Sequence, residues 1–335
     1  MTRIMPPGRS KSDTISARRD PVQLIIWGAA LALGVAALVV DHRSAWPAAR
    51  KTAGPFLTLA LVIVIGALSD RIGLFRLMAR SLIPEGAHPR VAFAAVLAFT
   101  AIVSGFVNLD VAVVVAIPVA LRVAERDRLA GDWLVAAVAL TANATSFLLP
   151  SSNLLVLNRS PLRTWTYVRD SWVAWLAVAA LTVTVLAVLL ARRPHTQSHA
   201  ITAPGGSARA VIDLAPMYIG VAAIRALVGS GLMLHGGFVQ EVTWGSIVAA
   251  GVNNLPAAAA IRALGPSGRW TAVLAMAIGP NLVVTGSVAT LICRRIARQG
   301  EVRLGMVSFS LVGVILVPLQ ILVAAAGLHV TGALP

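Results

Sequence analysis

Charged residues are scarce in this sequence. Only 12% of the 335 residues are Asp, Glu, Lys or Arg, whereas 58% are hydrophobic. A soluble domain of this length needs a more polar surface, and long uncharged runs recur along the chain. The composition therefore excludes a soluble globular protein and predicts a polytopic helical membrane protein.

Cysteine is almost absent. The single cysteine, Cys293, excludes an internal disulfide framework and a cysteine-rich metal site. The six histidines are scattered and show no metal-ligand spacing such as HExxH, and no nucleophile–base pair is evident. The sequence therefore predicts no metal site and no cofactor, and we expect that the protein is not an enzyme.

Acidic residues are few compared with basic ones: 13 against 28, for a net charge of +15. Such an excess can indicate nucleic-acid binding, but here the basic residues lie in short loops and tails, as at a cytoplasmic membrane face. We therefore expect the lipid bilayer, and no nucleic acid, as a partner. The expected location is the plasma membrane (the bacterial inner membrane), crossed several times.

Apolar runs and polar breaks divide the chain. Residues 1–20 predict a disordered cytoplasmic tail, and residues 193–208, rich in Pro, Gly, Ser and Thr, predict a cytoplasmic linker. The segments on either side, 21–192 and 209–335, are predicted to be two transmembrane repeats. Residues 71–90 interleave arginines with apolar residues, which fits either an interfacial helix or a solvated loop. Plain membrane spans are predicted at 22–40, 53–69, 171–191, 211–234 and 304–330.

One acidic residue, Asp110, lies between two apolar runs. An acidic side chain is costly in lipid and is a functional candidate by default. One long interrupted helix would fit, but we favour a re-entrant hairpin with Asn108 and Asp110 at its tip. Its arms, 94–106 and 111–121, would each be at most about 20 Å long, too short for the ~30 Å hydrocarbon core. Alternatively, Asp110 is only a helix cap.

Two further apolar runs contain polar breaks. The first, 133–149, ends at Pro150-Ser151-Ser152-Asn153. The second, 270–293, contains Gly279-Pro280-Asn281. Proline removes a backbone donor and obstructs the helix, and lipid offers no replacement partners. Helices broken at mid-membrane form the solute sites of secondary transporters, although a kink healed by neighbouring helices is the alternative.

These features occur twice. A Gly-x-x-Asn segment at 105–108 is followed by Trp133 and, ten residues later, Asn143. A similar segment at 251–254 is followed by Trp270 and, eleven residues later, Asn281. With the N-terminus inside, 19 of the 28 basic residues fall in inside segments, and the second copy is inverted relative to the first. The predicted fold is an all-α polytopic membrane protein of two inverted repeats, each with a re-entrant hairpin and a broken transmembrane helix.

Residues 278–291, followed by Ala297-Arg298-Gln299-Gly300, resemble the late-chain signature of arsenite permeases, members of the ion transporter superfamily. Residues 106–110, 142–155 and 253–256 resemble the first hairpin tip, first broken helix and second tip of that family. The likeness covers roughly 68–192 and 243–330. The chain departs from the family at Met276-Ala277-Ile278, where relatives often carry an acidic residue, and it is shorter than typical members.

The resemblance implies proton-coupled efflux of arsenite or antimonite. Arsenite is an uncharged trihydroxide at neutral pH, so its site needs neutral donors and acceptors. Asp110 is assigned to coupling a proton or sodium ion. Other readings are a coupled carrier of organic or inorganic anions, a sodium/proton antiporter, or a non-transporting scaffold. A homodimer and a pump ATPase partner also follow from the resemblance. The predicted substrate-binding residues are Asn108, Asn143, Ser152, Asn153, Asn253, Asn254, Asn281, Thr285, Gly286 and Ser287.

Overall fold

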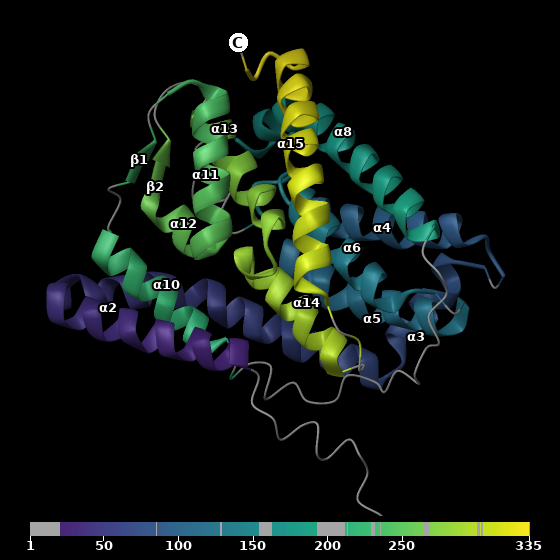
Figure 1. Cartoon of the computed structure of the whole chain (residues 1–335), viewed down its shortest axis with the longest axis horizontal. Helices are drawn as coiled ribbons and strands as arrows, with labels where there is room; N and C mark the ends of the chain where they lie inside the picture. The colour runs from purple at the N-terminus through teal and green to yellow at the C-terminus, as the bar shows by residue number, and fades with distance from the viewer. Residues whose placement is uncertain are drawn as a thin grey trace, which may run out of the picture.

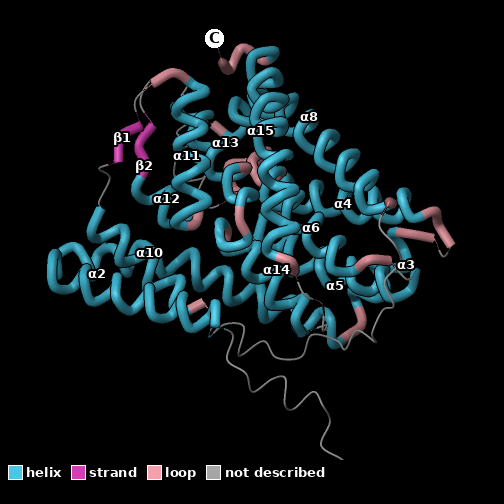
Figure 2. The backbone as a smooth tube through the Cα atoms, in the orientation of Figure 1, coloured by secondary structure: helices cyan, strands magenta, loops and turns pink. Residues whose placement is uncertain are grey.

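The computed structural model describes residues 21–84, 86–127, 129–153, 163–192, 212, 214–228, 232–234, 236–263, 268–299, 302 and 304–334. The predicted tail 1–20 and linker 193–208 lie outside these residues. The described chain is helical apart from turns and two three-residue strands (Figure 2).

A layer of helices is formed by α2 (Pro21–Arg71) and α10 (Ala215–Val228), which pack against each other (Figure 1). Asp41 interrupts α2 with φ −147° and ψ 71°, and its Oδ1 accepts the Ser44 N–H at 3.1 Å. The chain doubles back there, as the separate apolar runs 22–40 and 53–69 predicted. Alanines line the packing surface between the two elements and allow close approach: Ala37, Ala48, Ala223 and Ala226.

The remaining helices form a second body beside this layer (Figure 1). The α2–α10 layer packs against it through α5 and α12. A short helix, α3 (Leu74–Leu82), connects α2 to the first half of this body. That half contains α4 (Pro89–Phe106), α5 (Leu109–Asp127), α6 (Gly131–Ala144) and α8 (Thr164–Ala191). The second half contains α11 (Phe238–Val252), α12 (Asn254–Ala260), α13 (Gly268–Ala277), 3-10 turns at Gly279–Leu282 and Val284–Gly286, α14 (Val288–Gln299) and α15 (Met306–Val330).

The first hairpin is present, but its arms are not half-length. Helices α4 and α5 pack together and contain 18 and 19 residues, so the predicted arms 94–106 and 111–121 were too short. Pro89 provides a preformed first turn for α4. At the other end, α5 continues beyond the apolar run through Glu125 and Arg126, because charged side chains at a helix end can reach water.

The predicted span 211–234 was also wrong in part. Helix α10 ends at Val228, and Leu232–Leu234 forms a strand, β1, that pairs in parallel with β2 (Ile261–Ala263). Strand pairing satisfies the backbone groups of each segment that face the other strand.

Four helices of the described chain are long and apolar enough to cross a membrane: α2 from Trp27 to Arg71, α4, α8 and α15. Helix α15 also exposes large apolar side chains along one face, with Leu311, Ile315 and Leu322 each more than 60% exposed. Such a stripe is unfavourable in water and favourable against lipid. The chain is therefore a polytopic membrane protein.

Candidate functional site

The two broken helices meet at a pair of asparagines. Asn143 lies in the last turn of α6, and Asn281 lies in the 3-10 turn after α13. The Asn143 Nδ2 donates to Asn281 Oδ1 at 3.0 Å and to Thr290 Oγ1 at 2.9 Å, and the Asn281 Nδ2 donates to the Leu140 carbonyl at 2.8 Å. Both asparagines are almost fully buried. Breaks far apart in the sequence thus form one polar centre.

The two hairpin tips make the same pair of hydrogen bonds. Asn108 donates from Nδ2 to the Ser151 carbonyl at 3.3 Å, and its Oδ1 accepts the Asp110 N–H at 2.8 Å. Asn253 donates from Nδ2 to the Thr285 carbonyl at 2.9 Å, and its Oδ1 accepts the Leu255 N–H at 3.2 Å. Each asparagine caps the second helix of its hairpin and joins the tip to the neighbouring break.

The other predicted site residues lie in the same two breaks. Asn153 Nδ2 donates to Ser146 Oγ at 3.0 Å, and Ser146 Oγ donates to the Asn143 carbonyl at 2.8 Å. The Ser152 carbonyl accepts the Leu109 N–H at 2.8 Å, so this break also touches the first hairpin. At the second break, the Oγ of Ser287 accepts the Ala289 N–H at 3.1 Å and caps α14. Of the remaining predicted residues, Asn254 and Gly286 are buried and Thr285 is half-buried.

Three residues of this network were not among the predicted site residues: Ser104, Ser146 and Thr290. Ser104 Oγ on α4 donates to the Ala142 carbonyl at 2.6 Å and ties the hairpin to α6. The only sequence feature that could have indicated these three residues is a hydroxyl side chain within an apolar run. That signal is weak, because Ser and Thr often bond within their own helix, as Thr182 does with the Val178 carbonyl at 2.6 Å.

One acceptor at the centre remains open. Within the described chain, Asn143 Oδ1 is buried and has no hydrogen-bond partner, and the same is true of Thr141 Oγ1 two residues earlier. A buried polar atom without a partner costs about 1–3 kcal/mol. A cation or a hydroxyl donor bound at this point would remove that cost.

Asp110 lies in the first turn of α5 and is half-buried. The α5 N-terminus is capped by the Asn108 side chain, so the Asp110 side chain is not the cap. Among the described residues, the Asp110 carboxylate makes no ion pair. Arg225, a basic residue within the predicted span 211–234, lies in the α2–α10 layer, with its Nη1 3.5 Å from Thr52 Oγ1.

The electrostatic field of the centre comes from the backbone. Helices α5, α12 and α14 all begin at the network, capped by Asn108, Asn253 and Ser287. A helix N-terminus carries a partial positive charge and favours anions. The residues of the network itself are amides and hydroxyls, and none of them is basic. The arrangement can bind a solute rich in oxygen atoms without a basic side chain.

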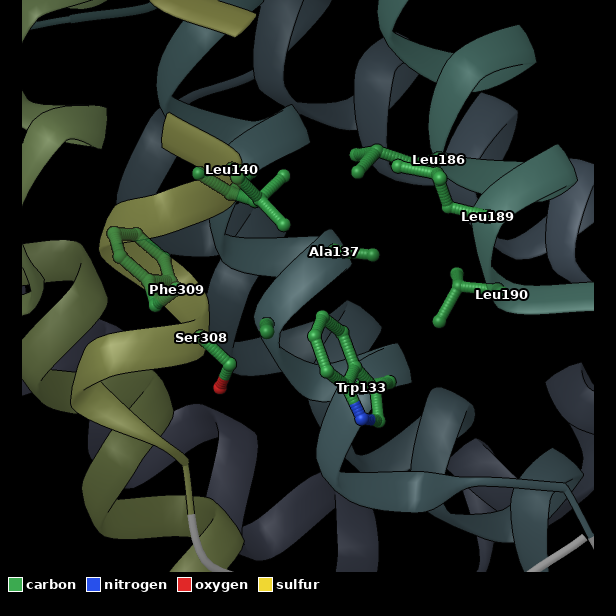
Figure 3. Close-up of a pocket in the computed structure, with 10 residues that line it drawn as sticks. Trp133, Ala137, Leu140, Leu186, Leu189, Leu190, Ser308 and Phe309 are labelled. Atoms are coloured by element: carbon green, nitrogen blue, oxygen red, sulfur yellow. The ribbon is translucent and has the colours of Figure 1, made fainter. Parts of the chain in front are cut away.

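A small pocket lies beside this centre, between α6, α8 and α15 (Figure 3). The surface of the pocket is apolar, although Trp133 and Ser308 are among the residues that line it. Leu140 lines the pocket with its side chain, while its carbonyl accepts the Asn281 amide. Asn143 and Asn281 do not line this pocket, and both are almost fully buried.

Comparison with known proteins identifies the family. A family model described as citrate transporter, CitMHS, matches residues 17–334. A search of curated proteins found no match. Because the family match extends over nearly the whole sequence and agrees with the broken membrane helices, the chain belongs to the citrate transporter family CitMHS and is a secondary membrane transporter, not an enzyme.

Proposed function

We propose that this chain carries a citrate-type polycarboxylate across the plasma membrane, coupled to protons or sodium ions, through the centre where its two broken helices meet. The observation that carries the proposal is the Asn143–Asn281 contact, which joins the breaks of the two halves. Helices α5, α12 and α14 begin in the network around this contact. Their N-termini carry partial positive charge, which favours carboxylates.

Two contacts support an arrangement of related, inverted halves. Asn143 bonds to Asn281, and the Gln320 Nε2 donates to Thr182 Oγ1 at 2.8 Å. Both pairs are separated by 138 positions in the sequence. In a molecule with two related halves, a residue near the two-fold axis meets its own counterpart. The matching bonds of Asn108 and Asn253 at the hairpin tips are a second sign of the same relation.

A polycarboxylate brings several negative charges, and helix N-termini contribute only about 0.3–2 kcal/mol each. Cations that travel with the substrate would supply the remaining compensation. Asp110 and the open Asn143 Oδ1 are the oxygen ligands available for that role. Coupling to protons or sodium ions is therefore part of the proposal, with Asp110 as the coupling group.

Arsenite or antimonite efflux is the second candidate. It is favoured by the neutral chemistry of the network, since an uncharged trihydroxide needs amide and hydroxyl partners rather than net positive charge. A soluble pump ATPase as partner belongs with this candidate. A homodimer is compatible with both.

Transport by the purified chain in lipid vesicles distinguishes the candidates. When a proton or sodium gradient is imposed, labelled citrate should accumulate inside the vesicles to a higher level than in protein-free vesicles. Accumulation should stop when the gradient is dissipated. Arsenite movement under the same gradients, without citrate movement, would replace the first candidate by the second. If neither solute moves in vesicles containing folded protein, both candidates are wrong.

A further inference from the structure

Helix α3 presents an unusual outer face. It follows α2 through a turn in which Gly73 adopts φ 80°, a left-handed conformation that suits glycine. One face is buried against α5, through Phe75 and Ala79, which are at most 5% exposed. The opposite face carries two kinds of exposed residue, arginines and large apolar side chains.

The basic part consists of Arg71 at the end of α2 and of Arg76 and Arg80, which are four residues apart and share one face of α3. All three are exposed, and within the described chain none makes an ion pair. Two acidic side chains among the described residues pair instead with arginines of α5: Asp70 with Arg122, and Asp127 with Arg126.

The apolar part lies next to these arginines. Ile72 is 80% exposed and Leu77 is 62% exposed, and Leu74 extends the same surface. In water such side chains would be unfavourable beside a charged group. At a membrane surface the same combination is favourable, because the apolar residues enter the acyl region while the arginines remain among the headgroups.

We propose that the outer face of α3 binds anionic phospholipid. Arg71, Arg76 and Arg80 hold the phosphate groups, while Ile72, Leu74 and Leu77 insert among the acyl chains. Guanidinium groups match phosphate oxygens in geometry as well as charge, and each basic residue at an anionic membrane surface contributes about 1 kcal/mol.

The position of α3 gives this lipid a structural consequence. The helix is the connection between the α2–α10 layer and the first hairpin. Its far end is held to α5 by Arg126, whose Nη1 donates to the Ile83 carbonyl at 2.9 Å. A lipid bound to α3 therefore contacts the segment that connects the α2–α10 layer to the first hairpin. The inference depends only on the membrane location of the chain and not on the identity of its solute.

Lipid titration tests the inference. Phosphatidylglycerol is added to the detergent-solubilised full chain, and bound lipid is counted by native mass spectrometry, with phosphatidylcholine as the neutral reference. The wild type should bind phosphatidylglycerol more tightly. The R76Q/R80Q variant should lose about 25-fold of that affinity, since each of the two arginines corresponds to about five-fold. Its binding of phosphatidylcholine should be unchanged. Both side chains are exposed, so folding should not change.

The matched control is R43Q/R50Q, which removes two exposed arginines from the part of α2 that follows its break at Asp41. It should retain the wild-type preference. The proposal is overturned if R76Q/R80Q binds phosphatidylglycerol like the wild type, or if the control loses the same affinity, because the effect would then follow net charge rather than this face.

Discussion

Replacing Asn281 with alanine is expected to abolish solute transport while leaving the chain folded in the membrane. The Asn281 amide is the contact between the two broken helices, through Asn143 Nδ2 and the Leu140 carbonyl. Alanine leaves the Leu140 carbonyl without its side-chain donor at a position shielded from water. Asn143 keeps its bond to Thr290, but the second break loses both of its side-chain hydrogen bonds to α6. The transport rate should therefore fall to less than a tenth of the wild-type rate.

The substitution should also lower the free energy of unfolding. Leaving a buried partner unsatisfied costs about 1–3 kcal/mol. Hydrogen bonds between membrane helices measured as coupling energies average about 0.6 kcal/mol and reach about 1.7. The Asn143→Ala/Asn281→Ala double-mutant cycle, measured by reversible unfolding, should therefore show a coupling of about 1 kcal/mol.

Thr243→Ala is the matched control for Asn281→Ala. The Thr243 hydroxyl is exposed and bonds within its own helix, to the Val239 carbonyl at 2.7 Å. This variant should transport like the wild type. Normal transport by Asn281→Ala would show that the contact between the breaks is only a packing feature.

Replacing Asp110 with asparagine is expected to abolish accumulation driven by an ion gradient and to leave substrate binding within a few-fold of wild type. The substitution keeps the shape of the side chain and the capping bond from the Asp110 N–H to Asn108 Oδ1. It removes the charge and the ability to take up a proton. If Asp110 only stabilises the α5 N-terminus, the loss should be about 0.3–1 kcal/mol of stability, and accumulation should continue.

Asp132→Asn separates these two roles. Asp132 also lies in the first turn of a helix, α6, but is exposed. Its substitution removes a comparable helix–charge interaction without touching the centre, so accumulation should remain normal. Accumulation and binding are measured with the same vesicles and labelled citrate. Gradient-driven accumulation by Asp110→Asn at the wild-type level would exclude a coupling role.

The break after α13 was predictable because its cause is local. Gly279 and Pro280 interrupt the helix through their own backbone chemistry, and the structure has 3-10 turns there. The asparagine at each hairpin tip was predictable for the same reason, since a capping residue needs only its immediate neighbours. The family match then confirmed the transporter class and left the arsenite assignment untested.

Features that depend on tertiary contacts could not be read from the sequence. Asn143 and Asn281 were predicted to bind substrate, and the sequence gives no sign that they bond to each other. The length of α5 was missed because its polar end is stabilised by contacts with distant segments, such as Arg122 with Asp70 at 3.8 Å. The position of Arg225 beside Thr52 likewise depends on the packing of α10 on α2.

The central claim is that two oppositely oriented halves share one site, and the direct test is labelling from each side of the membrane. Arg90 and Gly237 stand at the starts of α4 and α11, the first helices of the two hairpins, and both are exposed. A side chain at Gly237 meets no neighbour within 4 Å. Native Cys293 is buried and is replaced by alanine in both variants.

The predicted orientation, with the N-terminus inside, places the start of α4 on the cytoplasmic side and the start of α11 outside. Arg126 on α5 donates to the Ile83 carbonyl, so the ends of α3 and α5 lie together. Thr331, which directly follows α15, donates from Oγ1 to the Asp170 carbonyl at 2.7 Å, so the end of α15 lies beside the start of α8. A membrane-impermeant thiol reagent should therefore label Arg90→Cys only from the cytoplasmic side and Gly237→Cys only from outside. Labelling of both cysteines from the same side would contradict the account.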